Sequence, residues 1–499
     1  VDGRALGVEA VVEVALGRAR ARPGPDLGRT MGPARDLVAG VVAGDQTVYG
    51  ITTGFGAFAS TRIDPSEARA LQVNLLRSHA AGVGDPIPDE VVRAMLLLRA
   101  RTLAQGHSGV RPVVVERLLE LLDRNVLPVV PRYGSVGASG DLAPFAHLAL
   151  PLIGEGRVRR SGIETDAASA LAEEGLEPLT LEAKEGLSLL NGTEGMTAML
   201  CLAIDRTARL AAVADMAVAL TIEALMGSAR PFRADIHALR PHPGQVASAA
   251  RIAHLLAGSE IGASHADDFS HAVQDAYSLR CAPQVHGAVV DTLDHARRVV
   301  EIELGSVVDN PIVLAESNEV ISGGNFHGQP LAFAADFLTV AVTELGSISE
   351  RRTDRLLDPE RSAGLPPFLS PRPGLHSGYM LAQYTAAALV AENRVLSHPA
   401  SVESIPTSGS QEDHVSMGWG AARKLGEVID NTTRVLAVEL VCAAEGIAAR
   451  APLRPAPTTE VIVEAIRSRV APLTADRPIG IDLEAVARLI SSGGLDEFA

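Results

Sequence analysis

The stretch TEGMTAMLCLAIDRTARLAAVADMAVALTIEALMG, residues 193–227, is a strong signal for one long helix. It is rich in Ala, Leu and Met and contains no Pro, its only internal glycine before the end is Gly195, and charges recur at Asp205, Arg209 and Asp215. At about 1.5 Å per residue, such a helix is a rod of roughly 50 Å. We therefore expect it to form part of a helical core.

Three further stretches carry the same signal, at residues 330–357, 377–396 and 417–450. Each has an Ala-rich face that suits close contact between helices. Long and weakly polar helices of this kind pack as a bundle, and their Ala-lined faces often continue into subunit interfaces. A bundle of long helices is therefore expected in the second part of the chain.

The chain before about residue 190 reads differently. Shorter helices are predicted over residues 88–105 and 112–123, separated by Gly-rich segments. The best strand signal is PIVLAESNEVISGG, residues 311–324, which predicts a hairpin turning at Ser317 and Asn318. We expect a mainly α protein with few short strands, made of an irregular N-terminal domain over residues 1–192 and a helical-bundle core over residues 193–499.

Composition limits the classes of function. The chain has 499 residues, of which 47% are hydrophobic, and a formal net charge of −16, which argues against a nucleic-acid partner. Its N-terminus lacks the apolar core of a signal peptide, and no uninterrupted apolar run approaches the roughly 18 residues of a membrane span. The three cysteines are widely separated, as is usual in a reducing compartment. The sequence thus predicts a cytoplasmic protein without a membrane partner.

Two Gly-rich segments, Gly50–Gly56 and Gly134–Gly140, are candidates for a phosphate-binding loop or a hydrolase turn. Neither contains GxxxxGK[ST] or GxGxxG between a strand and a helix, so nucleotide binding is not expected. The sequences GASGD around Ser139 and GHSGV around Ser108 both lack the final glycine of GxSxG. The serine-hydrolase interpretation therefore also fails.

A metal site is not expected either. The 14 histidines include no HExxH motif. The pair His265 and His271 in SHADDFSH lies six residues apart, a spacing that does not stack two side chains on one helix face as four would. Solvated surface histidines are the simpler interpretation.

The triplet Ala138-Ser139-Gly140, within GSVGASGDLAPF at residues 134–145 and directly before a predicted helix start, has a chemical property of its own. If a sharp bend brings the Gly140 amide nitrogen onto the Ala138 carbonyl carbon, a five-membered ring closes. Loss of two waters, one of them with the Ser139 hydroxyl, then gives a methylidene-imidazolone, an electrophile made without an added cofactor. Glycine suits this chemistry because it has no Cβ to block the approach. Taken alone, the triplet is equally compatible with an ordinary turn.

The motifs together resemble the aromatic amino-acid lyases over residues from about Tyr49 to at least Gly418. The matching segments are YGITTGFGAF (49–58), LLRSHAAGVG (75–84), GSVGASGDLAPFAHLAL (134–150), KEGLSLLNGTEGM (184–196), RPHPGQ (240–245), VQDAYSLRCAPQVHG (273–287), GGNFHG (323–328) and SIPTSGSQEDHVSMG (404–418). The resemblance implies a nearly all-α, fumarase/aspartase-like lyase fold. It also implies a homotetramer whose active sites each draw residues from three subunits, with the methylidene-imidazolone formed autocatalytically from Ala138, Ser139 and Gly140.

The family's chemistry assigns roles to the matching residues. Elimination of ammonia from an α-amino acid needs an electrophile for the amine and a base at the β-carbon. By resemblance, Tyr49 is the base, a role that requires a phenol pKa below its usual value of about 10. Arg280 resembles the family's clamp for the substrate carboxylate, a task that suits a planar guanidinium.

The same resemblance gives supporting roles to four other positions. The residues that hold the substrate carboxylate and the prosthetic group are Asn191, Gln274 and Tyr277. Phe326 in GGNFHG is expected to form a wall of the substrate pocket.

Two positions bear on the identity of the amino-acid substrate. His79 matches a residue near the substrate's ring, and Glu412 matches an acid that accepts a hydrogen bond from an imidazole N–H. Relatives that act on phenylalanine or tyrosine tend to have Gln at the second position. The sequence thus favours L-histidine as substrate and urocanate as product. Two alternatives stay open, a tyrosine or phenylalanine ammonia-lyase or 2,3-aminomutase with the same prosthetic group, and a non-catalytic helical oligomer.

Overall fold

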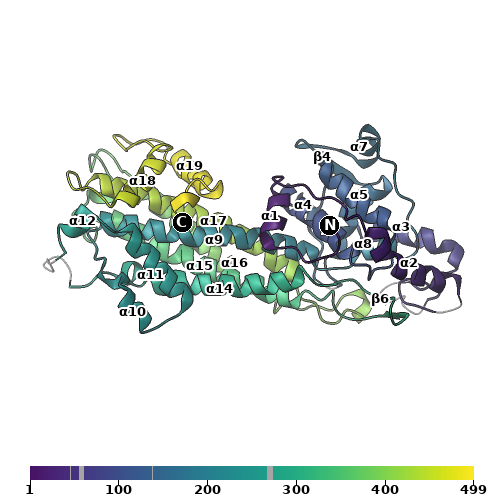
Figure 1. Ribbon diagram of the computed structural model, residues 1–499. Helices are drawn as coiled ribbons and strands as arrows, with labels where there is room; N and C mark the ends of the chain where they lie inside the picture. Colours follow the sequence, from purple (N-terminus) through teal and green to yellow (C-terminus); the bar gives the residue numbers. More distant parts are fainter. Residues whose placement is uncertain (45–46, 55–60, 138, 267–272, 499) are drawn as a thin grey trace. The chain divides into compact units, whose positions relative to one another are not determined.

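The computed structural model describes residues 1–44, 47–54, 61–137, 139–266 and 273–498, and the chain divides into two compact units (Figure 1). The first unit contains Val1–Leu202, Arg297–Asp336 and Pro399–Arg423, and the second contains Ala203–Ala296, Phe337–His398 and Lys424–Ala499. The predicted domains have a single boundary, at residue 192. In the structure, the first unit also includes two later segments, Arg297–Asp336 and Pro399–Arg423. The physical reason is that these segments pack onto the first unit, as the contacts below show.

The mainly α prediction is confirmed. The first unit's described helices and strands are α1 (Val8–Ala15), α2 (Leu27–Ala43), α3 (Ala68–His79), β1 (Val83–Pro86), α4 (Asp89–Leu103), α5 (Pro112–Asp123), β2 (Leu127–Pro128), β3 (Pro131–Tyr133), α6 (Leu142–Ala149), β4 (Arg157–Arg160), β5 (Ile163–Asp166), α7 (Ala167–Glu173), α8 (Glu185–Leu190), β6 (Ile312–Leu314) and β7 (Glu319–Ile321). The helices predicted over residues 88–105 and 112–123 correspond to α4 and α5.

The long helices are confirmed as well. The remaining helices are α9 (Glu194–Ala224), α10 (Ala234–Ala238), α11 (Pro243–Leu255), α12 (Glu260–Ala263), α13 (Tyr277–Arg280), α14 (Ala282–Glu303), α15 (Gln329–Leu357), α16 (Met380–Leu396), α17 (Gly418–Ala448), α18 (Pro457–Arg467) and α19 (Gly480–Ser491). The divisions between the two units fall inside α9, α14, α15 and α17 or just after α16. The stretch at residues 193–227 forms α9, with its end at Ala224.

The described strands are short, with two to four residues each. β6 and β7 pair antiparallel with Val313 opposite Val320, which confirms the predicted hairpin. The sequence did not indicate the other two sheets, in which β1 pairs with β3 and the order β2-β4-β5 forms a three-stranded antiparallel sheet. Strands of two to four residues that contain Pro and Arg carry no alternating pattern for sequence reasoning to find.

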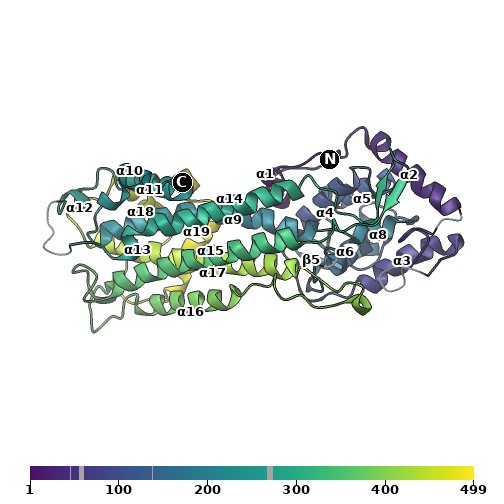
Figure 2. The same ribbon diagram turned by 90° about the horizontal axis from the view of Figure 1, so that it is seen from below.

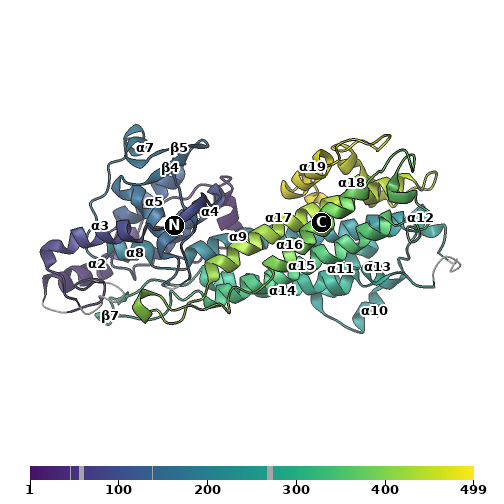
Figure 3. The same cartoon turned by 180° about the vertical axis from the view of Figure 1, so that it is seen from behind.

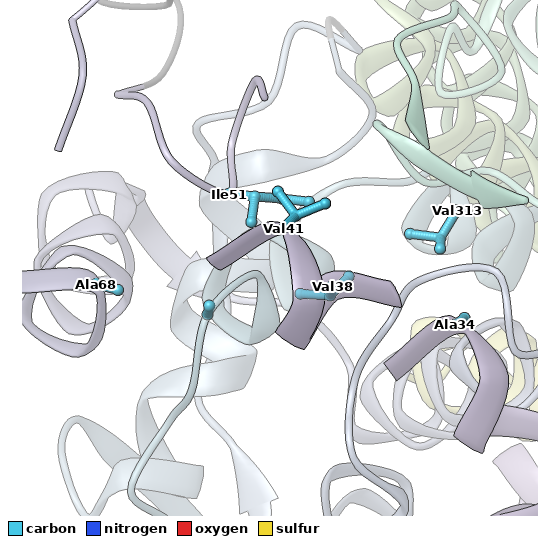
Figure 4. Packing of buried hydrophobic residues seen from close by; sticks show 7 residues of the cluster. Ala34, Val38, Val41, Ile51, Ala68 and Val313 are labelled. Carbon is cyan, nitrogen blue, oxygen red and sulfur yellow. The ribbon is translucent and has the colours of Figure 1, made fainter. Parts of the chain in front are cut away.

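A hydrophobic cluster in the first unit fixes the segment that follows α2 (Figure 4). Val38 and Val41 of α2 and Val313 of β6 pack with Ile51, which lies two residues after Tyr49. All four side chains are at most 6% exposed. Because β6 belongs to one of the returning segments, this cluster explains why that segment joins the first unit.

In the second unit the long helices run side by side, as Figure 2 shows for α14, α15, α16 and α17. Both apolar contacts and hydrogen bonds between buried polar side chains hold these helices together. Glu439 of α17 accepts hydrogen bonds from Thr221 of α9 at 2.8 Å and from Ser349 of α15 at 2.6 Å, and it pairs with Arg352 of α15. These bonds satisfy polar groups that have no access to water.

The C-terminal helices pack on the same bundle, with α18 and α19 beside α17 in Figure 3. Arg467 of α18 pairs with Glu445 of α17 at 2.9 Å, and Arg434 of α17 pairs with Glu484 of α19 at 2.7 Å. This part of the chain, from Ala451 onward, has no predicted site residue.

One helix among the described residues, α15, has the length and apolar composition of a membrane span. Its apolar window has a mean hydropathy of 1.5, and 67% of that window is buried inside the protein. Burial of this extent is typical of a core helix.

Candidate active site

A cavity of about 630 Å³ in the first unit collects residues from four distant parts of the sequence. Five of the predicted site residues line it, namely Tyr49, His79, Ser139, Asn191 and Glu412. Apolar side chains that the motif analysis did not single out form much of the remaining wall, among them Leu71, Leu75, Leu142, Leu187 and Leu190. A site of this size with a few polar groups has the character of a small-molecule pocket.

Tyr49 stands in a turn that its neighbours fix in place. The backbone N–H groups of Ile51 and Thr52 donate to the Val48 carbonyl at 3.2 and 3.0 Å, and the Gly50 N–H donates to the Thr53 hydroxyl. With Ile51 buried in the cluster of Figure 4, the half-buried Tyr49 ring is held at the cavity wall.

The helix start predicted directly after the triplet is present, since α6 begins at Leu142. Ser139 and Gly140 have φ angles of +49° and +76°, both in the left-handed region. A Cβ added to Gly140 would overlap the carbonyl group of Gly192, so only glycine fits at that position. Ala138 lies outside the described residues. Gly140 is buried behind the cavity wall, and Ser139 lines the cavity.

Asp141, the residue after the triplet, was not singled out by the sequence. Its carboxyl group is fully buried and accepts hydrogen bonds from the Met196 N–H and the Ser135 hydroxyl, each at 2.9 Å. Burial raises the pKa of Asp141 to about 7, against the lowering effect of those two hydrogen bonds. Its position inside the GASGD sequence is the signal that could have revealed it.

Asn191 directly follows the last residue of α8 and is buried. Its side-chain amide donates to the Asn310 carbonyl at 2.8 Å. The adjacent Asp309 carboxylate accepts from Lys184 and Ser188, each at 2.9 Å. This buried set ties the segment before β6 to α8, so the amide of Asn191 is fixed in orientation.

His79 lies at the C-terminal end of α3 and is half-buried. Its Nδ1 atom is 3.0 Å from the Leu75 carbonyl, which can only accept, so Nδ1 carries a proton and Nε2 is the acceptor of the neutral ring. Burial lowers the pKa of His79, while the Leu75 hydrogen bond and the charge of Glu412 act in the opposite direction. The ring is therefore neutral at pH 7.

Glu412 lies in the loop between α16 and α17, within the segment Pro399–Arg423 that belongs to the first unit. Thr407 and Glu412 form an isolated antiparallel bridge, and the Thr407 hydroxyl donates to the Glu412 carboxylate at 2.9 Å. The two backbone bonds and the side-chain bond together hold the carboxylate at the cavity. Thr407 was missed because only the structure shows this contact.

The three site residues predicted around residue 277 lie in the second unit. Gln274 and Arg280 line a different cavity, of about 1180 Å³, and Tyr277 begins α13 with 71% of its surface exposed. The Arg280 guanidinium lies 4.7 Å from the centre of the Tyr277 ring, and its Nε donates to the Asp275 carbonyl at 2.9 Å. Within one chain, the structure thus gathers the predicted residues into two groups.

Phe326 belongs to neither group. It lies half-buried in a turn between β7 and α15, and it is not among the described residues that line the 630 Å³ cavity.

Within the described ranges, no group of three or more His, Cys, Asp or Glu residues is arranged to hold a metal ion. His265 is within these ranges, where its Nε2 lies 3.2 Å from the Gly227 carbonyl, whereas His271 is outside them.

Comparisons with known proteins agree with the motifs. The family model described as aromatic amino acid lyase matches residues 6–468. A histidine ammonia-lyase of Deinococcus radiodurans is 55% identical over 462 residues, which cover 93% of this chain and 88% of the relative. A histidine ammonia-lyase of Gloeobacter violaceus is 53% identical over 497 residues, which cover 100% and 96%.

The chain is also similar to solved structures of an aminomutase and an ammonia-lyase. A tyrosine aminomutase of Streptomyces globisporus has a TM-score of 0.94 at 42% identity, covering 100% of this chain and 97% of that one. A histidine ammonia-lyase of Trypanosoma cruzi has a TM-score of 0.92 at 42% identity, covering 100% and 94%. The chain therefore belongs to the aromatic amino acid lyase family and is a carbon–nitrogen lyase, as its motifs predicted.

Proposed function

We propose that this enzyme eliminates ammonia from L-histidine and releases urocanate. The observation that carries the proposal is that Tyr49, His79, Ser139 and Glu412 line one cavity of a size suited to an amino acid. The relatives that are 53% and 55% identical and are named histidine ammonia-lyase support the same substrate.

The prosthetic group of the proposal is a methylidene-imidazolone made from Ala138, Ser139 and Gly140. The described part of the triplet fits this group, because Ser139 and Gly140 are sharply bent and no side chain fits on Gly140. When formed, the group supplies the electrophile that turns the substrate amine into a leaving group. Neither a metal nor a nucleotide has a role in this proposal.

Tyr49 is the base in this account. The β-proton of L-histidine passes to the Tyr49 oxygen, the electrons of the C–H bond form the carbon–carbon double bond, and the C–N electron pair leaves with the nitrogen as ammonia. The base must be a phenolate at the moment of transfer, and a site that excludes water and directs donors at the oxygen stabilises that form. Asn191, fixed through Asn310, is suited to hold the amino-acid end of the substrate.

Glu412 and His79 are proposed to recognise the imidazole ring. A carboxylate accepts from an imidazole N–H, and the neutral His79 presents Nε2 as a second acceptor. The chemical complement of this pair is a ring with N–H donors, which a phenyl or phenol ring lacks at the same positions. This pair is the feature that favours histidine over the other aromatic amino acids.

Completion of the site requires residues from other copies of the chain in this proposal. Arg280, the candidate carboxylate clamp, lies with Gln274 and Tyr277 in the second unit, and the high exposure of Tyr277 leaves it accessible to another subunit. We propose a homotetramer in which each active site combines residues of three subunits, with Phe326 contributing to the pocket wall. Exposed apolar side chains on α15 and α16, such as Phe337 and Tyr384, support subunit contacts.

The cytoplasm is the proposed location. Cys201, Cys281 and Cys442 are all free thiols in the structure, which suits a reducing compartment.

A second candidate follows from the similarity to tyrosine aminomutase at a TM-score of 0.94. An enzyme of that kind keeps the same prosthetic group and returns the amine to the β-carbon. Product analysis separates the two, since a β-amino acid forms only in the second case.

The proposal is tested by comparing wild type with Ser139→Ala and Ser66→Ala. Ser66 is exposed, and its hydroxyl donates to the Asp64 carboxylate at 2.6 Å, away from the cavity residues, so it serves as the matched serine control. Ser139→Ala should lose most urocanate formation from L-histidine while the control keeps it. Undiminished turnover by Ser139→Ala would contradict the proposal.

A further inference from the structure

The backbone of Gly192 is paired with the bend at Ser139 and Gly140. The Gly192 N–H donates to the Ser139 carbonyl at 3.2 Å, and the Gly192 carbonyl accepts from the Asp141 N–H at 2.8 Å. Gly140 and Gly192 form an isolated parallel bridge. The two hydrogen bonds thus flank Gly140 on both sides, so the position of Gly192 determines how tightly the loop is bent.

Arg99 of α4 lies directly behind Gly192. Its Nη1 donates to the carbonyls of Ser188 and Asn191 at 2.9 and 2.8 Å, and its Nη2 pairs with the Glu194 carboxylate. A Cβ on Gly192 would overlap both the Arg99 guanidinium and the Glu194 carboxylate. The ion pair is therefore packed against the Gly192 α-carbon.

The contribution of Arg99 to folding stability does not by itself explain a buried arginine at this position. Its side chain is fully buried, and the Nε of Arg99 and the Oε1 of Glu194 have no hydrogen-bond partner among the described residues. A buried ion pair with unsatisfied atoms gains little over an apolar replacement of the same volume. The planar guanidinium nevertheless bridges two carbonyls and one carboxylate while lying 4.9 Å from the Phe145 ring centre, which a lysine ammonium cannot reproduce.

We propose that Arg99 is a positioning residue for formation of the prosthetic group, a role that rests on the proposed function. By fixing the Asn191–Gly192 backbone, it holds Ser139 and Gly140 in the bend from which the ring closes. In that step the Gly140 nitrogen bonds to the Ala138 carbonyl carbon. The Ala138 carbonyl oxygen then leaves as water with the hydrogens of the Gly140 and Ser139 nitrogens, and a C=N double bond forms between the Ala138 carbon and the Ser139 nitrogen. The Ser139 hydroxyl leaves with the Ser139 α-hydrogen as a second water, which leaves the exocyclic methylidene double bond.

The test is the intact mass of purified and folded protein, measured without substrate. Arg99→Met combined with Glu194→Gln removes the guanidinium without leaving a buried unpaired charge, and Arg99→Lys keeps a charge opposite Glu194. The matched control is Arg101→Met, since Arg101 is a buried arginine on the same helix that donates to the carbonyls of Arg4 and Ser306 instead. Circular dichroism and thermal unfolding verify that each variant is folded.

Wild type and Arg101→Met should both be lighter than the encoded chain by two water molecules. The Arg99 variants should retain mostly the full encoded mass although they are folded. A folded Arg99 variant whose mass deficit is as complete as that of wild type would overturn the role of Arg99, and Arg99→Lys decides the question if the double variant does not fold. A wild type of full encoded mass would instead contradict the proposed prosthetic group itself.

Discussion

The hydroxyl group of Thr407 donates a hydrogen bond to the Glu412 carboxylate at 2.9 Å, at the edge of the cavity that Tyr49 and Ser139 share. Among the described residues, Thr407 forms no hydrogen bond with any other predicted site residue. Its effect on the reaction should therefore pass through the orientation of Glu412.

Thr407→Val should raise the KM for L-histidine by about tenfold, because a hydrogen bond to a charged group is worth about 1.5 kcal/mol or more. Steady-state kinetics with urocanate detection measures this change. Thr407→Ser is the matched control, since it keeps the hydroxyl and should keep the KM. Equal KM values for all three proteins would contradict the orienting role.

Glu412→Gln should lower kcat/KM for L-histidine by about a hundredfold, since loss of a charge-assisted hydrogen bond costs about 2–3 kcal/mol. Glutamine has nearly the same shape but no negative charge, so packing around the cavity should be preserved. Kinetics with L-histidine and L-tyrosine in parallel measure the selectivity. A Gln variant as selective for histidine as wild type would remove Glu412 from substrate recognition.

Asp141 should make folding stability depend on pH. Its pKa is raised to about 7 by burial, so the native state binds more protons than the unfolded state between the two pKa values. Its contribution to the free energy of unfolding is fully present below the unfolded pKa and is lost as pH rises through about 7. Denaturant unfolding of wild type and Asp141→Asn should therefore diverge by about 2 kcal/mol between about pH 5 and pH 8. Parallel profiles would show that Asp141 does not titrate in this range.

Glu439→Gln should destabilise the second unit by about 3–5 kcal/mol, because it leaves Arg352 buried without its counter-charge. Glu484→Gln is the control, since Glu484 pairs with Arg434 at a half-exposed position where a pair is worth about 1 kcal/mol or less. Thermal unfolding compares the two. Replacing both partners, as Arg352→Met with Glu439→Leu, should recover most of the loss; an equal loss in the double variant would point to packing and not to charge.

The long helices could be predicted from the sequence because their signal is local. Residues 193–227 contain no Pro, and α9 occupies almost the whole stretch. The strands β2 and β4 could not be predicted, since the pairing of Leu127 with Arg159 is set by tertiary packing and not by a repeating pattern.

The candidate site residues that stand in recognisable motifs could be predicted from the sequence, and the residues outside such motifs could not. Ser139 and Glu412 stand in motifs that the family resemblance identifies, and both line one cavity. Arg99 is one of several arginines on an apolar helix, and its partners Ser188 and Asn191 lie about ninety residues further along the chain. No local pattern in the sequence indicates such a contact.

The central claim is tested most directly by incubating purified wild-type enzyme with L-histidine and following urocanate in the ultraviolet, with L-tyrosine and L-phenylalanine in parallel. The account predicts urocanate from histidine and little product from the other two amino acids. No urocanate from histidine, together with coumarate, cinnamate or a β-amino acid from the others, would contradict the assignment of Glu412 and His79 to imidazole recognition.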